Sequence, residues 1–372
     1  MSASPESAAQ SAAMLAESDA LHARVRRYVA SSEGDRERFD ELALAIAAFQ
    51  IEHVEPVRRL TSARGFDPRR ARSVAELPAL PVDAFKLRRV AAHPPEFDLR
   101  VFRTSGTTQG SERRGEHAFR TLDTYRAASI AWGLEHLTRG MRPARLFVLA
   151  PSSIELPDSS LSFMIDAMAE ALGMSPRHLV SLERGLDFEA FEAEAAACAD
   201  AGEPVLVLGT SFAYVYLLDA LDGRSRPLPS GSRAMITGGF KGRTREVPEA
   251  ELRREIARAL GLDAAQLVGE YGMTELSSQL WEPSIEGGAG RYRTPAWLRV
   301  EAVEPDTLEP VAPGEVGLAR FVDLANVDSA IAVQTVDRIR VVEGEVELLG
   351  RAPGAPPRGC SLAIDDLLRA GS

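Results

Sequence analysis

The sequence predicts an α/β fold in which a buried parallel sheet is followed by a smaller β-rich region. From about residue 100, short apolar runs alternate with helical patterns, and from about residue 297 strands and turns replace them. Nearly continuous apolar strands separated by helices are typical of a parallel sheet that is covered on both faces. A chain of 372 residues, 45% of them hydrophobic, is long enough for two or three domain-sized units.

The N-terminal part is expected to be helical after a short tail. Residues 1–18 are rich in Ser, Ala and Glu and are interpreted as a disordered tail, and residues 19–99 as a helical region. From Ser18 to about Leu60, apolar residues recur at helical spacing. Prolines then break the pattern, so the segment 77–86 (LPALPVDAFK) is expected to be an extended lead into the core.

The core is expected to span residues 100–350, and residues 351–372 to form a short C-terminal segment. The parallel strands are expected at 145–150, 204–208, 233–237 and 266–269. The helices around them are expected at 122–136, 160–172, 186–201, 211–222 and 248–260. The β-rich subdomain, from about residue 297, is expected to contain strands at 297–303, 315–322, 330–341 and 345–349.

Composition excludes several classes of protein. The net charge of −11 and the lack of a basic stripe argue against a nucleic-acid partner. No run of about 18 apolar residues occurs, so no membrane span is expected, and the N-terminus lacks the features of a secretion signal. The two cysteines, Cys198 and Cys360, exclude a disulfide framework and indicate a reducing cytoplasm. The scattered histidines make a zinc site improbable.

Lysine is rare in this chain. It occurs only at Lys86 and Lys241, whereas the other 41 basic residues are arginines. A phosphate-binding Walker loop needs a lysine followed by Ser or Thr, but these two lysines precede Leu87 and Gly242. That class of nucleotide site is therefore excluded.

Two segments carry nucleotide-like chemistry. The run 104–111 (TSGTTQGS) combines glycines, which let several N–H groups converge on one anion, with hydroxyl donors. The run 270–275 (EYGMTE) follows an apolar strand and offers an aromatic ring beside a glycine, a hydroxyl and a carboxylate that could hold Mg²⁺ with phosphate oxygens. Alone, the first run is equally compatible with an ordinary surface turn, and the second is better explained as a strand-to-turn junction with a solvated glutamate.

Together and in this order, these segments resemble the adenylate-forming superfamily of acyl-CoA synthetases, adenylation domains and luciferases. The turn 237–240 (TGGF), the segment 334–337 (QTVD) and the pair 350–351 (GR) resemble three further motifs of that superfamily. A closer resemblance, from about Leu77 to the C-terminus, is to the acyl-protein synthetase family of the bacterial bioluminescence fatty acid reductase complex. Phenylacetate-CoA ligases are the next most similar group.

The resemblance implies a fold and a set of site residues. The fold would be the large domain of an adenylate-forming enzyme with a β-rich subdomain, and the cofactors ATP and Mg²⁺. Glu275 would be catalytic and would hold Mg²⁺. The β- and γ-phosphates would be bound by Thr104, Ser105, Gly106, Thr107 and Thr108, and the α-phosphate by Thr274. Adenine would lie beside Gly238, Gly239 and Phe240 and would stack on the segment of Tyr271 and Gly272. The ribose would be bound by Asp337, and Arg351 would lie at the hinge.

The C-terminus departs from the superfamily pattern. Most members carry a further C-terminal domain with a catalytic lysine, but only 21 residues follow Arg351 and none of them is lysine. The acidic residue expected two places after the hinge arginine is replaced by Pro353. A full C-terminal domain is therefore expected to be lacking. Either Lys241 supplies the missing positive charge as a catalytic residue, or arginines and Mg²⁺ do.

Cys360 is the remaining candidate catalytic residue. In the bioluminescence family a cysteine near the C-terminus receives the acyl group as a thioester, and Arg358 precedes Cys360 closely enough to favour the thiolate. Asp365 and Asp366 oppose that effect. Cys198 lies in an alanine-rich helical pattern and is interpreted as a packing residue.

The resulting function is ATP-dependent activation of a carboxylic acid, a fatty acid by resemblance, with transfer to a thiol for delivery to an acyl reductase or an acyl carrier protein. Two alternatives stay open: an acyl- or aryl-CoA ligase that uses free coenzyme A, and a non-catalytic nucleotide sensor. A hydrolase with Ser211 as nucleophile is excluded because that order needs a later histidine, and the last one in the chain is His178.

Overall fold

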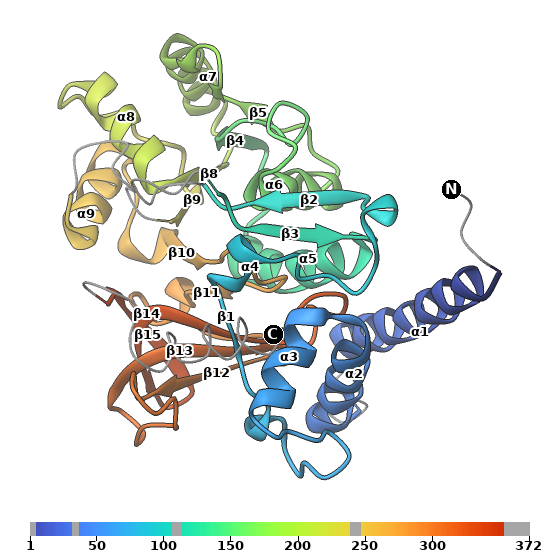
Figure 1. Cartoon of the computed structure of the whole chain (residues 1–372). Coiled ribbons are helices and arrows are strands. Elements are labelled where there is room, and N and C mark those ends of the chain that lie inside the picture. The colour runs from blue at the N-terminus through green and yellow to red at the C-terminus, as the bar shows by residue number, and fades with distance from the viewer. Residues whose placement is uncertain (1–4, 32–36, 106–112, 239–246, 353–372) are drawn as a thin grey trace.

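The computed structural model describes residues 5–31, 37–105, 113–238 and 247–352, with side chains from residue 9 onward. Within these ranges the chain forms two main sheets, which lie in the upper and lower halves of Figure 1. The first has six strands in the order β11-β10-β9-β8-β4-β5, parallel except for β11. Its strands are β4 (Arg145–Leu149), β5 (Arg177–His178), β8 (Val205–Thr210), β9 (Arg233–Thr237), β10 (Leu267–Tyr271) and β11 (Leu280–Trp281).

Helices cover both faces of this sheet. They are α5 (Asp123–Thr138), α6 (Ser160–Ala171), α7 (Phe188–Ala201), α8 (Ser211–Leu221) and α9 (Glu249–Leu260). Along β8, Val205 and Val207 pack with α7, α8 and α9, while Leu206 and Leu208 pack with α5 and α6. Successive side chains of a strand point to opposite faces, so a sheet buried on both sides reads as one apolar run. The expected parallel strands and their helices are thus confirmed.

The second sheet has five strands and is mostly antiparallel. Its strands are β1 (Leu80–Pro81), β12 (Leu298–Val303), β13 (Val316–Asp323), β14 (Ala332–Val342) and β15 (Glu345–Arg351). The β-rich region that the sequence predicts from about residue 297 is confirmed, and β1 adds to it by pairing in parallel with β14. The lead segment before the core is therefore an edge of this sheet.

The N-terminal helices are α1 (Pro5–Ala30), α2 (Phe39–His53) and α3 (Glu55–Ala63). The disordered tail expected at residues 1–18 is wrong from Pro5 onward, because α1 begins there and Met14 and Ser18 are buried. Alanine and glutamate are strong helix formers, and packing against α2 and α5 gives this stretch the tertiary support that composition alone does not reveal.

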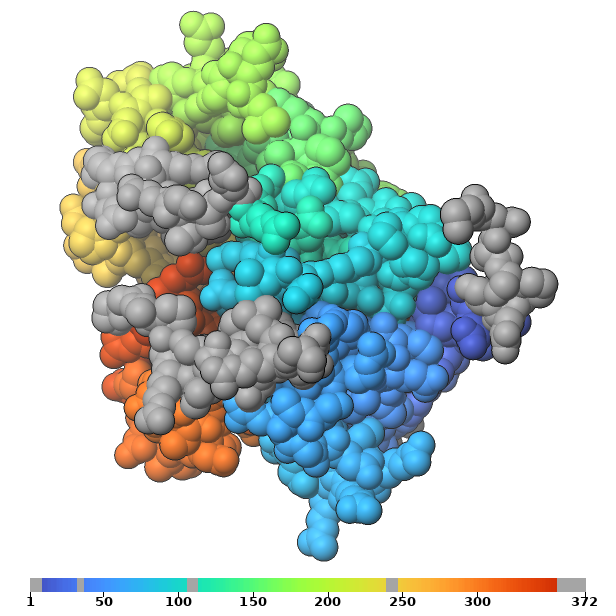
Figure 2. Space-filling model, in the orientation of Figure 1, coloured from blue at the N-terminus to red at the C-terminus, as the bar shows by residue number. Residues whose placement is uncertain are grey.

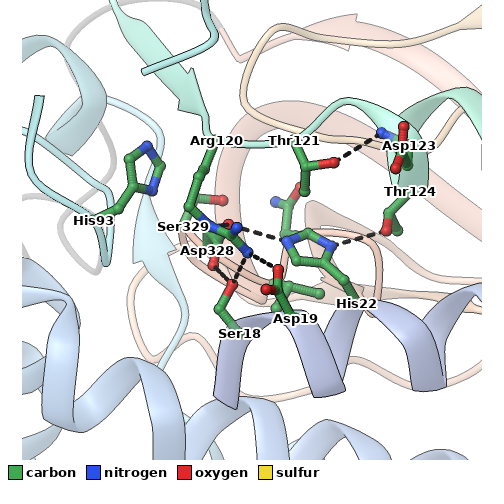
Figure 3. A network of polar contacts seen from close by, with 12 residues as sticks. Ser18, Asp19, His22, His93, Arg120, Thr121, Asp123, Thr124, Asp328 and Ser329 are labelled. Atoms are coloured by element: carbon green, nitrogen blue, oxygen red, sulfur yellow. Dashed lines mark hydrogen bonds and ion pairs between the residues drawn. The ribbon is translucent and has the colours of Figure 1, made fainter. Parts of the chain in front are cut away.

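A buried polar network attaches α1 to the core (Figure 3). Ser18 Oγ donates to Asp328 Oδ1 at 2.5 Å, and His22 Nε2 lies 3.0 Å from Asp328 Oδ2. The other ring nitrogen of His22 is 2.8 Å from Thr124 Oγ1, and Arg120 donates to Ser18 Oγ at 2.8 Å. Because Asp328 is buried, removing its partners would leave an uncompensated charge, so α1 belongs to the fold.

Smaller elements complete the described chain. The hairpin of β2 (Arg100–Arg103) and β3 (Glu116–Phe119) flanks residues 104–115. The others are β6 (Val180–Ser181), β7 (Gly185–Leu186), the one-turn helix α4 (Ala84–Leu87) and the 3₁₀ turns η2 (Val74–Glu76), η3 (Pro95–Phe97), η4 (Ala264–Gln266) and η5 (Ser284–Glu286). In the described part of the chain, every helix is too short or too polar to cross a membrane.

Candidate active site

Three of the expected ATP-binding residues meet where the two sheets face each other. Tyr271 ends β10 of the first sheet, and its hydroxyl donates to Asp337 Oδ2 on β14 of the second sheet at 2.7 Å. Arg351 Nε, at the end of β15, lies 3.3 Å from Asp337 Oδ1. The Tyr271 ring lies nearly parallel to Phe321, with centroids 6.0 Å apart. We call Tyr271, Asp337 and Arg351 the nucleoside side of the site.

The electrostatics of the nucleoside side favour a fixed hydrogen bond. Burial, together with the nearby Asp337 carboxylate, raises the pKa of Tyr271 well above its ordinary value. The phenol therefore stays protonated and donates to Asp337, whose other oxygen accepts from Arg351. Asp337 is held by neighbours on two sides while 19% of its side chain remains exposed, which suits it to accept hydrogen bonds from hydroxyl groups.

A second group of side chains converges on Gly115. A Cβ atom added there would lie 3.1 Å from Thr104 Cγ2 and 3.5 Å from both Glu275 Oε1 and Lys86 Cγ. The backbone N–H of Gly115 donates to Thr104 Oγ1, and the carbonyl of Gly115 accepts from the backbone N–H of Thr104, each at 2.9 Å. We call Thr104, Glu275 and Lys86 the phosphate side. A side chain at position 115 would fill the space that they share.

His117 holds the loop that carries Thr274 and Glu275. Its Nδ1 lies 2.8 Å from the Thr274 carbonyl, and its Nε2 lies 2.8 Å from Ser329 Oγ. Burial lowers the pKa of His117 to about 4, so the ring is neutral at pH 7. Since a carbonyl only accepts, Nδ1 carries the proton and Nε2 accepts from Ser329, which neighbours Asp328 of the α1 network.

Buried polar groups of the second sheet fix the same loop. Asn326 Nδ2 donates to the Glu275 carbonyl at 2.9 Å. Asp323 accepts from the backbone N–H groups of Ser277 and Ser278 at 3.0 and 2.9 Å, and burial raises the pKa of Asp323 to about 6. Sequence reasoning missed His117, Asp323 and Asn326. Their only signal was that they are polar residues close to apolar strands.

The turn 237–240, which is expected to lie beside adenine, is within the described residues only as far as Gly238. Gly238 follows β9 with φ of +67°, a conformation that glycine adopts readily, and its carbonyl accepts from Ser211 Oγ at 2.6 Å. A Cβ at Gly272 would lie 2.5 Å from Glu270 Oε1, so a side chain there would displace that carboxyl group. Burial raises the pKa of Glu270 to about 7, although the hydroxyl of Thr237 donates to its carboxylate.

Several expected site residues lie outside the described ranges. They are Gly106, Thr107, Thr108, Gly239, Phe240, Lys241 and Cys360. Thr104 and Ser105 are described at the edge of the phosphate loop, where both are half-buried. Cys198 is described on α7, where it is 2% exposed and burial raises its pKa, in agreement with a packing role.

The donor set fits a cation that is shared with phosphate. Over the described residues, no three His, Cys, Asp or Glu side chains gather into a cluster that could hold a metal ion alone. Glu275 is 6% exposed and lies beside Thr104 at the phosphate side. A single carboxylate with phosphate oxygens and water is the usual environment of Mg²⁺.

The chain is similar to known acyl-activating proteins. A family model described as "Acyl-protein synthetase, LuxE" matches residues 9–369. The long-chain-fatty-acid–luciferin-component ligase of Aliivibrio fischeri is 21% identical over 313 residues, 80% of each chain. The ligase of the same name from Vibrio harveyi is 23% identical over 207 residues, 52% of this chain and 53% of that one.

Solved structures share the fold. A 2-hydroxyisobutyryl-CoA ligase in the postadenylation state, with an acyl-adenylate bound, has a TM-score of 0.61 at 16% identity, covering 84% of this chain and 67% of that one. The ligase in the thioesterification state, with 2-HIB-AMP and CoA, has a TM-score of 0.59 and covers 91% and 68%. ATP-bound MatB from Rhodopseudomonas palustris has a TM-score of 0.50, and this chain spans 47% of its length. The expected adenylate-forming fold is thereby confirmed.

Proposed function

Because the chain belongs to the acyl-protein synthetase (LuxE) family, we propose that it activates a fatty acid with ATP and passes the acyl group to its own Cys360. Members of this family belong to the class of AMP-forming acid–thiol ligases, and so does this chain. The observation that carries the proposal is the 2.7 Å contact between Tyr271 and Asp337, which joins two ATP-binding motifs from different sheets.

Each side of the site takes one part of the nucleotide. On the nucleoside side, the Tyr271 ring lies against adenine and Asp337 accepts hydrogen bonds from the ribose hydroxyls. On the phosphate side, the loop 104–108 donates to the β- and γ-phosphates, and Glu275 is the carboxylate that holds Mg²⁺. The bound ion neutralises charge on the phosphates. His117 keeps Thr274 within reach of the α-phosphate by holding its carbonyl.

The chemistry needs positioning more than covalent work by the protein. A carboxylate oxygen of the acid attacks the α-phosphorus, the bond from that phosphorus to the bridging oxygen breaks, and pyrophosphate leaves with the electron pair. Fixed donors aimed at the developing charge supply most of the rate enhancement in such sites. The thiolate of Cys360 then attacks the acyl carbonyl, and AMP leaves from the tetrahedral intermediate.

The acyl acceptor and the substrate class rest on the relatives and on the sequence. Both relatives reported above are named as ligases that join a long-chain fatty acid to a luciferin component. The chain has two thiols, and the one on α7 is buried. Cys360 therefore accepts the acyl group and delivers it to a reductase partner.

Intact-mass analysis after incubation with a long-chain fatty acid and MgATP tests the proposal. The wild type should gain one acyl mass that neutral hydroxylamine removes. Cys360→Ser should still catalyse acid-dependent pyrophosphate exchange but lose that adduct, whereas Cys198→Ala should keep it. If the wild type forms no adduct and instead acylates free coenzyme A, the chain is an acyl-CoA ligase.

A further inference from the structure

Lys86 is placed at the phosphate side by the backbone on which it lies. Strand β1 pairs in parallel with β14, with Leu80 opposite Val333, and the N–H of Val82 donates to the Gln334 carbonyl at 3.0 Å. The chain then turns directly into α4, which carries Lys86. Because β14 also carries Asp337, one strand sets the positions of both residues.

Packing fixes α4 between the two sheets. Phe85 is 2% exposed and lies edge-on to the His117 ring, with centroids 5.6 Å apart. Figure 1 shows α4 at the junction of the upper and lower halves, and in Figure 2 the cyan surface that contains α4 lies between the green upper part and the blue lower part. The side chain of Lys86 is therefore attached to a firmly packed helix at the boundary between the two sheets.

The side chain of Lys86 points toward the phosphate side. Its Cγ lies as near to the Gly115 position as Glu275 Oε1 does, 3.5 Å in each case. Its Nζ lies 2.9 Å from Asp83 Oδ1, and 29% of the side chain is exposed. A lysine held by one partly exposed carboxylate can redirect its flexible ammonium group to a phosphate at small cost.

Two nearby arginines, Arg114 and Arg103, have other partners. Arg114 donates to the Thr104 carbonyl and, at 2.7 Å, to Asp158 Oδ2. Arg103 donates to Glu116 Oε1 at 2.9 Å. Both belong to the hairpin of β2 and β3 and its adjoining residues, and both tie that hairpin together. Among the described residues, the carboxylate that pairs with Lys86 is Asp83, which lies three residues away on the same turn.

We propose that Lys86 is a catalytic residue that donates hydrogen bonds to the β- and γ-phosphates of ATP, an inference that rests on the proposed function. When the α-phosphorus–oxygen bond breaks, the electron pair goes to pyrophosphate, and the ammonium group of Lys86 stabilises that charge. Lys86 transfers no proton in this step. Lys86, and not Lys241, is then the lysine that supplies positive charge at the phosphates.

Equilibrium binding without acid substrate tests this assignment, because AMP lacks the two phosphates concerned. Lys86→Met should weaken binding of MgATP by about 10- to 100-fold, the range for a hydrogen bond to a charged group, and leave AMP binding within about twofold. Lys86→Arg should recover part of the MgATP affinity because it keeps the charge. The same variants are assayed for acid-dependent pyrophosphate exchange.

Three control variants separate this role from a structural one. Arg88→Met removes an exposed positive charge two residues away and should leave MgATP binding unchanged. Asp83→Asn removes the ion pair but keeps the ammonium group, so it should not reproduce the loss. Lys241→Met should affect MgATP less than Lys86→Met does. Thermal unfolding of Lys86→Met should match that of the wild type.

The proposal is overturned if Lys86→Met binds MgATP like the wild type, if it loses AMP and MgATP equally, or if only Lys241→Met shows the ATP-specific loss. Failure of the proposed function is a different result. In that case the wild type shows no acid-dependent pyrophosphate exchange, while the ATP-specific loss in Lys86→Met still identifies Lys86 as a phosphate ligand.

Discussion

The nucleoside side and the phosphate side of the site are built in different ways. On the nucleoside side, strand ends from both sheets bring Tyr271, Asp337 and Arg351 into a chain of direct hydrogen bonds. On the phosphate side, the side chains of Thr104, Glu275 and Lys86 surround Gly115. They can approach this closely because Gly115 has no side chain. The residues of the first side hold each other by hydrogen bonds, whereas those of the second side meet around a glycine.

This difference has a consequence for catalysis. Groups that bind the nucleoside contact it equally in the ground state and the transition state, so they raise affinity more than rate. Groups that bind the phosphates face the charge that moves onto pyrophosphate. Variants on the phosphate side should therefore lower the rate of pyrophosphate exchange, and variants on the nucleoside side should mainly lower affinity.

Glu275→Ala should cause the largest loss. If Glu275 is the Mg²⁺ ligand, as proposed above, its removal should reduce acid-dependent pyrophosphate exchange by about 10²- to 10³-fold, the range for removing one electrostatic stabiliser of a transition state. AMP binding should change little because AMP contacts the opposite side. Glu116→Ala, a carboxylate variant on the exposed face of β3, is the matched control and should exchange normally. Normal exchange by Glu275→Ala would remove Glu275 from the phosphate side.

A buried group next to each side should make the free energy of unfolding depend on pH, in opposite directions. Burial raises the pKa of Glu270, next to Tyr271, from its ordinary value of 4.5 to about 7. Between these pH values the unfolded chain has lost the proton that the folded chain keeps, so the free energy of unfolding falls as pH rises, by about 3 kcal/mol. His117, beneath Thr274, has its pKa lowered from 6.5 to about 4, so its contribution is lost as pH falls through that range.

Urea unfolding of Glu270→Gln and His117→Asn at pH 4 to 8 measures these contributions. The stability of Glu270→Gln relative to the wild type should increase by about 3 kcal/mol between pH 4 and pH 8. His117→Asn keeps a donor near the Nδ1 position and should lose the extra acid sensitivity between pH 6.5 and pH 4. The exposed Glu96→Gln is the control. If the free energies of unfolding of Glu270→Gln and the wild type changed with pH in parallel, Glu270 would not be a buried carboxyl group with a raised pKa.

The same contrast explains how far the sequence could predict the molecule. The strands of the first sheet were predictable because a sheet buried on both faces needs apolar residues at every position, as in β8. The nucleoside side was predictable because Tyr271 and Asp337 each stand in a motif that resembles a known family. The part of helix α1 before Ser18 was missed because its support, such as Asp328, comes from a residue that is distant in the sequence.

The phosphate side was predictable only in part, for the same reason. Glu275 and Thr104 stand in motifs to which the resemblance assigns a role, whereas it assigns none to Lys86 at the end of the lead segment 77–86. Its role depends on β1 pairing with β14, a contact between segments about 250 residues apart. His117 likewise acts through Thr274 and Ser329, and no spacing pattern links those three positions.

Tyr271→Phe should have the smallest effect and the most informative pattern. It removes the hydroxyl that donates to Asp337 but keeps the ring against Phe321. Without the phenol, Asp337 loses a donor that holds its carboxylate in place for the ribose, and nucleotide binding should weaken by about 10-fold. Because the lost contact belongs to the nucleoside side, MgATP and AMP should weaken equally, and the rate of pyrophosphate exchange at saturating ATP should change by less than about threefold.

The comparison variant is Lys86→Met, which should discriminate between the two nucleotides when Tyr271→Phe does not. Isothermal titration of both ligands into both variants gives four affinities, and the two-sided site predicts that only one of the four stays near the wild-type value. That one is AMP binding to Lys86→Met. If Tyr271→Phe weakened MgATP far more than AMP, the Tyr271–Asp337 contact would act on the phosphates, and the division of the site into two sides would be wrong.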